Sequence, residues 1–315
     1  MTRSDSVRGA AVMAAVVLIW GSFLPVSKVV LTAIDPYWLT LLRYGVAAAV
    51  FLALTAAVEG RSSLATEGHG AVLFLAGASG FCGFSLFVFE GLERARPEHG
   101  AMILALVPLW VVIADWIATR RRPRAVVLAC IAAALAGEAL VVTRGDLSRL
   151  GSGGDHLGNA LILLASLFWT AYTLGMQRFP GWSPLRYSAL AGALGWLAVA
   201  AATLIATALG HAAPPPAQEI ARVAWPLAYL VAVVSILAVF LWNTAVRLIG
   251  PLSASLFANF APVVTFAIVV LQGQTLTAAE VGGAALVLAA LVANNLYRMR
   301  LLAEARAGAS PGGVA

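Results

Sequence analysis

Residues 9–31 read GAAVMAAVVLIWGSFLPVSKVVL, an apolar stretch in which Lys28 is the single charged residue. A helix needs about 20 apolar residues to cross the hydrocarbon of a bilayer, so this stretch predicts a transmembrane helix. Nine more stretches of similar length and character follow it along the chain. The ten expected spans are residues 9–31, 36–58, 70–92, 98–119, 124–143, 157–177, 184–209, 224–246, 251–271 and 278–297.

The composition supports the same interpretation. Hydrophobic residues make up 61% of the chain and charged residues 11%, whereas a soluble domain has roughly half and a quarter. We therefore expect an all-α polytopic membrane protein. The first stretch lacks a small-residue cleavage site after a short apolar core, and Trp20 and Pro25 lie within its full length. We interpret it as a retained helix and not as a signal peptide.

Landmark residues of the first half recur in the second half, about 150 positions further on. The recurring pairs are Trp20 and Trp169, Pro36 and Pro184, Pro97 and Pro251, and Pro108 and Pro262. Because each unit would have five crossings, an odd number, the second unit must cross the bilayer upside down. Inverted repeats of this kind are typical of transporters, with the substrate site near the midplane. The sequence thus predicts two inverted five-helix repeats, residues 9–145 and 157–300, around a central cavity.

The basic residues indicate the orientation. With both termini inside, twelve Lys and Arg residues fall in inner segments and six in outer segments, which favours cytoplasmic N- and C-termini in the cell inner (plasma) membrane. The net charge of +6 is spread over short loops and forms no single patch, so we expect no nucleic-acid partner. The expected partners are the lipid bilayer and a small-molecule substrate, and a monomer fits these expectations.

Cysteine and histidine residues are few and scattered. Cys82 and Cys130 both lie within predicted spans, where a small buried apolar role is the usual one. The four histidines occur singly in or beside loops, and this spacing offers no metal cluster. We therefore expect neither a metal nor a cofactor.

Several short motifs resemble a known family. Trp20-Gly21-Ser22, Leu42-Arg43-Tyr44-Gly45 and the matching patterns around Pro108 and Pro262 are similar to those of the drug/metabolite transporter superfamily, in its ten-helix EamA branch. The resemblance extends from about Ala10 to Tyr297. It implies a transporter with two EamA-like repeats.

Two further motifs narrow the resemblance. Glu98-His99-Gly100 and Trp242-Asn243 are similar to those of bacterial exporters of aromatic and other neutral amino acids. The four-helix multidrug relatives exchange protons through a glutamate in their first helix, but this chain has no carboxylate between Gly9 and Leu31. Proton antiport by that device is unsupported here, and uniport or another form of coupling stays open.

Charged residues within spans are costly, at about 2.5 kcal/mol or more each, and are candidates for function. The candidates are Lys28, Arg43, Glu90, Asp115 and Glu138. Arg43 lies deepest among the cations and needs a partner, for which we consider Glu90 and Glu138. Such a bridge would lock helices, and the alternative is a role in gating or in binding a substrate carboxylate. Glu90 can instead pair with Arg94 at helical spacing, and Asp115 with Arg120.

Polar and aromatic residues on helix faces indicate the substrate path. Ser255, Asn259, Pro262 and Phe266 share one face of the ninth predicted helix, and the prolines favour either a moving kink or a kink fixed by packing. We expect Trp20, Trp169, Trp242 and Asn259 to meet at the repeat interface, although tryptophans at this depth can also serve packing alone. The expected substrate-path residues are Trp20, Ser22, Arg43, Trp169, Tyr172, Trp242, Asn243 and Asn259. The expected structural or gating residues are Pro25, Lys28, Pro108, Pro262, Glu90 and Glu138.

Small residues at four-residue spacing predict where helices approach closely. Ala133 with Gly137 and Ala279 with Gly283 are two such pairs. The function class that fits all these features is an exporter of small metabolites, most simply aromatic and other neutral amino acids, working by alternating access. Exporters of nucleosides or cationic compounds are the alternative. An intramembrane enzyme is disfavoured, because no histidine lies in the interior of a span and the spans hold no Gly-x-Ser-x-Gly or His-Glu-x-x-His motif.

Overall fold

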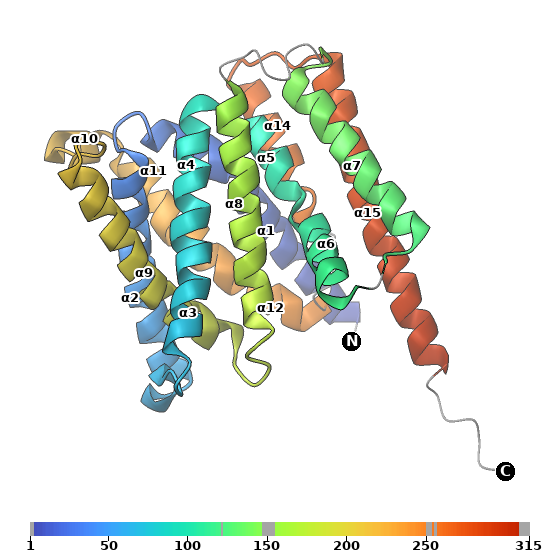
Figure 1. Cartoon of the computed structure of the whole chain (residues 1–315), viewed down its shortest axis with the longest axis horizontal. Coiled ribbons are helices and arrows are strands. Elements are labelled where there is room, and N and C mark those ends of the chain that lie inside the picture. Colours follow the sequence, from blue (N-terminus) through green and yellow to red (C-terminus); the bar gives the residue numbers. More distant parts are fainter. Residues whose placement is uncertain (1–2, 121, 147–154, 250–253, 255–256, 309–315) are drawn as a thin grey trace.

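The computed structural model describes the chain except for residues 1–2, 121, 147–154, 250–253, 255–256 and 309–315. The regular elements of the described residues are all helices, which run side by side between two ends of a bundle (Figure 1). α1 begins and α15 finishes at the same end, which we name the terminal end. The opposite end is named the far end.

Nine helical stretches among the described residues are long and apolar enough to cross a membrane. They match nine of the predicted spans. The ninth predicted span, 251–271, is represented by the shorter apolar helix α14, and part of that span lies outside the described residues. The elements are α1 (Arg3–Val30), α2 (Pro36–Val58), η1 (Arg61–Leu64), α3 (Gly70–Gly77), η2 (Ala78–Gly83), α4 (Phe84–Arg94), α5 (Pro97–Ala105), α6 (Val107–Thr119), α7 (Ala125–Thr143), α8 (Asp155–Met176), α9 (Pro184–Ala208), α10 (Ala217–Arg222), α11 (Ala224–Ala228), η4 (Tyr229–Leu237), α12 (Ala238–Ile249), α14 (Ala261–Leu271) and α15 (Ala278–Gly308).

The same local chemistry sets the start of two helices, α2 and α9. Asp35 caps α2 by accepting hydrogen bonds from the backbone N–H groups of its first turn, and Pro36 follows as the first helical residue. Ser183 caps α9 in the same way, and Pro184 follows it. A capping oxygen and a proline at the first position both favour helix initiation, which is why these two boundaries fall where the sequence predicts them.

Two of the spans contain a π-helical segment. The third span runs as α3, η2 and α4, and the eighth span runs as α11, η4 and α12. Both η2 and η4 are π-helices. In η4 the Ser235 hydroxyl donates to the Leu230 carbonyl, five residues earlier, at 2.9 Å. Such segments are rare in helices and often lie at functional sites.

The helices pack in a regular scheme. α7 lies along α15 on one side of the bundle, and α2 lies along α9 on the other (Figure 1). Between these pairs, α1 packs against α12 and α14, and α8 packs against α4, α5 and α6. Each long helix therefore buries one face against helices from the other half of the chain.

The contact between α7 and α15 is backbone on backbone. A Cβ atom added at Gly137 would lie 2.7 Å from the carbonyl oxygen of Gly283, and one added at Gly283 would lie 2.5 Å from the carbonyl oxygen of Gly137. Only glycine fits such an approach at both positions. The close contact predicted from the small residues of these helices is therefore confirmed.

The helix α1 contains Pro25, which has no backbone N–H and leaves the carbonyl of Gly21 without its helical donor. The Thr265 hydroxyl of α14 donates to this carbonyl oxygen at 2.6 Å. Gly21 lets α14 approach, because a Cβ there would lie 2.7 Å from the Ala261 carbonyl oxygen. A hydrogen bond from a neighbouring helix thus replaces the one that proline removes.

We expect Thr265→Val to lower the free energy of unfolding in detergent by about 1–3 kcal/mol, because it leaves a buried carbonyl without a partner. Thr244→Val is the matched control, since the Thr244 hydroxyl bonds only to Phe240 of its own helix, at an exposed site. That control should change the free energy by less than about 0.5 kcal/mol. Denaturant titration followed by tryptophan fluorescence measures both, and equal losses in the two variants would contradict the assigned role.

Candidate functional site

Arg43 of α2 is a buried cation without a described counter-charge. Its side chain is 3% exposed. Its Nη2 atom donates to the Tyr44 hydroxyl at 2.5 Å and to the Ser85 hydroxyl at 3.3 Å. The guanidinium carbon lies 4.5 Å from the ring centroid of Tyr44 and 5.1 Å from those of Phe23 and Phe89. Its Nε and Nη1 atoms have no hydrogen-bond partner.

The expected ion pair between Arg43 and a glutamate is wrong in this conformation. Glu90 pairs with Arg94 instead, with 2.8 Å between Oε2 and Nη1. Phe89 of α4 faces Arg43. Glu90 is the next residue of the same helix, so its side chain points about 100° away from Arg43. Glu138 is buried on α7, and neither of its carboxylate oxygens has a hydrogen-bond partner.

The aromatic residues form two groups and not one pocket. Trp20 of α1 contacts Trp242 of α12, with 5.2 Å between ring centroids. Two residues after Trp20 on α1, the Ser22 hydroxyl lies 2.7 Å from the hydroxyl of Tyr229, the first residue of η4. Trp169 belongs to a different hydrophobic cluster from Trp20. The three tryptophans expected to meet, together with Asn259, at the repeat interface make no direct ring contact as a set: Trp20 contacts Trp242, whereas Trp169 contacts Phe84 and Tyr172.

Trp169 and Tyr172 belong to a chain of rings that leads to Arg43. Trp169 and Tyr172 of α8 are 5.2 Å apart between ring centroids. Tyr172 contacts Phe81 of η2 at 5.2 Å, and Phe81 contacts Tyr44 at 5.0 Å. The hydroxyl of Tyr44 then meets the guanidinium. Sequence reasoning missed Phe81, because its place opposite two other helices has no local sequence signal.

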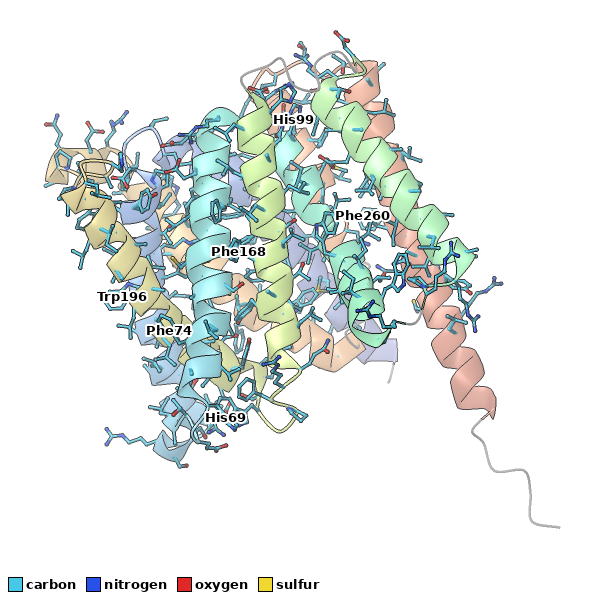
Figure 2. All side chains as sticks on the ribbon, in the orientation of Figure 1. His69, Phe74, His99, Phe168, Trp196 and Phe260 are labelled. Carbon is cyan, nitrogen blue, oxygen red and sulfur yellow. The ribbon has the colours of Figure 1, made fainter. Side chains whose placement is uncertain are left out.

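The fourth and ninth spans are both interrupted just before a proline. α5 ends at Ala105, and α6 restarts at Val107 with Pro108 in its first turn. α14 starts at Ala261 with Pro262 in its first turn. Phe260, which precedes α14, lies near the middle of the bundle (Figure 2). The prolines thus mark breaks and not kinks within continuous helices.

The break at α14 corrects the predicted polar face of the ninth helix. Asn259 lies in the turn before α14, so Asn259 and Phe266 do not share one continuous helix. The Asn259 side chain is 4% exposed, and its Nδ2 atom has no hydrogen-bond partner. Ser255 lies outside the described residues, as do the side chains of Asn243 and Asp115.

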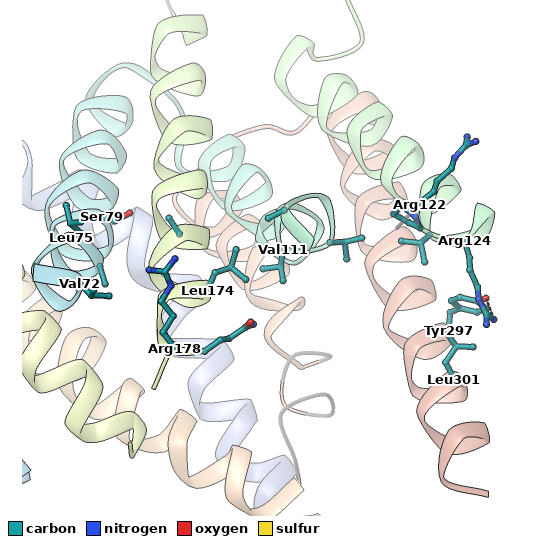
Figure 3. Close-up of a pocket in the computed structure, with 18 residues that line it drawn as sticks. Val72, Leu75, Ser79, Val111, Arg122, Arg124, Leu174, Arg178, Tyr297 and Leu301 are labelled. Carbon is teal, nitrogen blue, oxygen red and sulfur yellow. Dashed lines mark hydrogen bonds between the residues drawn. The ribbon is translucent and has the colours of Figure 1, made fainter. Parts of the chain in front are cut away.

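A cavity of about 1000 Å³ opens in the half of the bundle towards the terminal end. Its walls come mainly from α3, η2, α6, α8 and α15, and Figure 3 shows side chains of these elements around it. Ser79 and Ala171 line it. Ala171 precedes Tyr172 on α8, and Ser79 precedes Gly80, whose backbone lies against the Tyr172 ring. Three basic residues also line it: Arg122, Arg124 and Arg178. Together they give a positive border to the cavity.

The far end is held together by a set of charged residues that we name the far-end cluster: Arg96, Glu98, His99, Arg144 and Glu280. Arg96 contacts Glu98 at 2.5 Å and Glu280 at 2.6 Å. Glu98 and Glu280 are fully buried, and His99 is 1% exposed. Figure 2 shows His99 near the far end of the bundle. The cluster joins the start of α5 to the end of α7 and the start of α15.

Sequence reasoning missed Glu280, although a signal for it was present. Thr277 and Glu280 form a capping box, a pattern readable from the sequence as Thr-x-x-Glu before an apolar run. The Thr277 backbone N–H donates to Glu280 Oε2 at 2.7 Å, and the Glu280 backbone N–H donates to the Thr277 hydroxyl at 3.2 Å. The cap fixes one carboxylate oxygen and leaves Oε1 for Arg96.

Lys28, an expected gating residue, also belongs to the far end. Its ammonium donates to the backbone carbonyls of Leu92, Glu93 and Ala95, at the C-terminal end of α4. A cation at this end of a helix is favourable. Within the described residues, no three or more His, Cys, Asp or Glu side chains are grouped to hold a metal ion.

Comparisons with known proteins agree with this architecture. The family model of the EamA-like transporter family matches residues 7–143 and 156–296. The uncharacterized transporter YrdR of Bacillus subtilis (strain 168) is 31% identical over 286 residues, which cover 89% of each chain. The uncharacterized transporter YyaM of the same organism is 28% identical over 260 residues, covering 82% of this chain and 84% of that one.

A solved structure named "Crystal structure of protein" covers 95% of this chain and 99% of its own, with a TM-score of 0.63 and 22% identity. At that identity the likeness concerns the fold alone. The family match extends over most of the residues, and both relatives are named as transporters. The resemblance found in the motifs is thereby confirmed. The chain belongs to the EamA-like transporter family and is a multi-pass membrane transporter.

Proposed function

We propose that this transporter exports amino acids, aromatic and other neutral ones, by alternating access across the cell inner membrane. The observation that carries the substrate class is the buried guanidinium of Arg43, whose charge no described carboxylate balances. Leaving a charge unpaired in a membrane interior costs at least about 2.5 kcal/mol. A substrate that brings its own carboxylate would offset this cost.

The geometry around Arg43 suits one end of an amino acid. The Nε and Nη1 atoms of the planar guanidinium keep unused N–H groups, and a charge-assisted hydrogen bond from either of them can hold a carboxylate. The rings of Phe23, Tyr44 and Phe89 surround the same group. Aromatic faces attract an ammonium group and pack against apolar side chains. A zwitterion with an apolar side chain matches all three surfaces.

The cavity and the ring chain supply a path from the terminal end. A ligand in the cavity at Ser79 and Ala171 would lie next to Tyr172, from which Phe81 and Tyr44 lead to Arg43. At the far end, the far-end cluster and the Lys28 contacts tie the helices together. We interpret this conformation as open at the terminal end and closed at the far end.

The packing scheme supports two inverted repeats, residues 9–145 and 157–300, as the moving halves. If α1 corresponds to α8, then the packing of α1 on α12 has its counterpart in the packing of α8 on α4. The π-segments η2 and η4 then correspond, as do the breaks before Pro108 and Pro262. α7 and α15 would be equivalent to each other, and so would α2 and α9. Rocking of such halves about a central site is the usual route to alternating access.

The terminal end is proposed to face the cytoplasm. The three arginines bordering the cavity lie there, and the distribution of Lys and Arg over the loops favours this orientation. A neutral amino acid would then enter the cavity from the cytoplasm and leave at the far end. The chain acts here as a carrier and not as an enzyme, with the bilayer and a small molecule as its partners.

If Arg43 binds the substrate carboxylate, the transporter should prefer a substrate that has this group over one that lacks it. We expect purified protein in liposomes to transport phenylalanine about 10–100 times better than phenylalanine amide, since a hydrogen bond to a charged group contributes about 1.5–3 kcal/mol. Arg43→Ala should lose this preference, and Arg43→Lys should keep part of it because the charge remains without the planar fork. Initial rates measure the ratio of the two compounds.

Arg94→Ala is the control for this experiment, because the ion pairs of Arg94 are exposed and join it to Glu90 and Glu93 of its own helix, α4. It should keep the wild-type ratio. A ratio near one in the wild-type protein would contradict the proposal, as would a ratio that survives in Arg43→Ala. Preferred transport of nucleosides or cationic compounds would point to the alternative substrates.

Trp169 should matter most for bulky substrates. Loss of its ring leaves space beside Tyr172 and Phe84, so Trp169→Ala should reduce phenylalanine transport more than threonine transport, by about fivefold or more in their ratio. Trp225→Ala is the control, because Trp225 is 80% exposed. Uptake of the two labelled amino acids at equal reconstituted protein gives the ratio. Equal losses would show that Trp169 serves packing alone.

The orientation can be tested by thiol labelling in intact cells, in a background without Cys82 and Cys130. A cysteine at Arg122, beside the cavity at the terminal end, should be protected from an impermeant reagent added outside. A cysteine at Ala213, in the exposed far-end loop before α10, should react readily. Mass shift on a denaturing gel reports both. Reversed labelling of the two sites would overturn the orientation.

A further inference from the structure

Glu138 is a buried acid that the proposed transport path does not use. Its side chain is 8% exposed. It lies on the face of α7 that also carries Ala134 and Val141, which are both fully buried. These two residues pack in one hydrophobic cluster with Met102 of α5 and Val287 of α15. The carboxyl group is thus held in an apolar region of the membrane interior.

No described polar group compensates this carboxyl. Both of its oxygens lack a hydrogen-bond partner. On α14, no residue from Ala261 to Leu271 is ionisable, and on α15 none lies between Glu280 and Tyr297. On α7 itself, the other ionisable side chain between Ala125 and Thr143 is the Cys130 thiol.

The charged groups on neighbouring elements are engaged elsewhere. Those on α5, at the end of α7 and at the start of α15 belong to the far-end cluster, where they contact one another. Arg144 is six residues from Glu138 along the chain, or about 9 Å at 1.5 Å per residue. The cluster is also balanced, since Arg96 and Arg144 face Glu98 and Glu280. Among the residues that the structure describes on these elements, no cation is therefore left over for Glu138.

An ionised carboxylate in such a place would carry a penalty of several kcal/mol. The group avoids this by binding a proton, which makes it a neutral carboxylic acid in the present conformation. Acids inside membrane spans that take up and release protons are the usual elements of proton relays. A metal cation is a poorer occupant, because it would need several oxygen ligands, and the described residues offer no such group.

The position of Glu138 links its protonation to the movement of the two halves. The adjacent Gly137 lies against Gly283 of α15, backbone on backbone. Water cannot reach the carboxyl while α5, α7 and α15 stay packed as they are here. A change in this packing would admit water and allow the proton to leave.

We propose that Glu138 is the proton-binding site that couples export to the transmembrane proton gradient. The proposal rests on the transport function proposed above. The carboxylate takes one proton from water when the far end is open and keeps it in the present conformation. It releases the proton to water on the terminal side when substrate binding from that side loosens the packing of α7 against α15. One proton would thus move inward as one substrate moves outward.

The first test separates substrate exchange from coupling. In liposomes, Glu138→Gln should exchange labelled for unlabelled phenylalanine at equal pH within about threefold of the wild-type rate, because the amide resembles the protonated acid. Phenylalanine-driven proton movement, read by a pH dye inside the liposomes, should fall at least about tenfold. Glu90→Gln is the matched control, since Glu90 pairs with Arg94 at the surface, and it should keep both activities.

The outcomes decide the proposal. Proton movement that persists in Glu138→Gln overturns it, as does its absence in the wild-type protein. Coupling to a sodium gradient in place of the proton gradient also overturns it. Loss of exchange together with coupling in Glu138→Gln assigns the residue to packing or to the substrate path, and overturns it too.

A second test needs no substrate and stays valid if amino acids are not transported. Infrared spectra of the substrate-free protein in bilayers should contain a protonated carboxylic acid band that is absent in Glu138→Gln and present in Glu90→Gln. The absence of a band assignable to Glu138 overturns the proposal, whatever the substrate. A band that is present while no amino acid is exchanged refutes the proposed substrate class and supports proton binding.

Discussion

Polar groups buried in hydrocarbon must find their partners within the protein, and this constraint governs the rest of the structure. It explains why Thr265 reaches across from α14 to a carbonyl that Pro25 leaves without a donor. It also explains why the helix breaks before Pro108 and Pro262 lie inside the bundle. Irregular backbone at such depth is tolerated where other protein groups or water surround it. The backbone groups that proline leaves unpaired are thus satisfied by the packing of neighbouring helices.

The same constraint divides the charged residues into two kinds. At the far end, Arg96 and Glu280 satisfy each other in a cluster that holds three helices together. Arg43 and Glu138 are buried without such partners. In a chain with so few charges, an unpaired charge in the interior is expensive to keep, and it is best explained by an occupant that comes and goes. The paired charges hold helices together at the far end, and the two unpaired groups are those that we propose to bind the substrate and the proton.

The sequence predicted those features that depend on local chemistry. Span lengths follow from apolar runs, and the starts of α2 and α9 follow from a capping residue before a proline. The surroundings of Arg43, namely Phe23 on α1 and Ser85 and Phe89 on α4, could not be found in this way, because they depend on how α1 and α4 are rotated about their axes next to α2. Glu280 was missed for a related reason. Its capping box is visible in the sequence, but its contact with Arg96, 184 residues away, is set only by packing.

The π-segments η2 and η4 affect how the sequence of such a protein can evolve. A π-turn holds one more residue than an α-turn, so η2 shifts the phase of everything that follows it in α4. Removing one residue from η2 could restore α-helical winding without breaking the helix. Ser85 and Phe89 would then keep their direction, because the π-turn absorbs the extra residue. A return to α-helical winding with every residue kept would instead rotate them by about 100° relative to the residues before them. A change between π- and α-winding in η2 at constant length is therefore a route by which relatives could exchange the side chains presented to Arg43 while keeping the same fold.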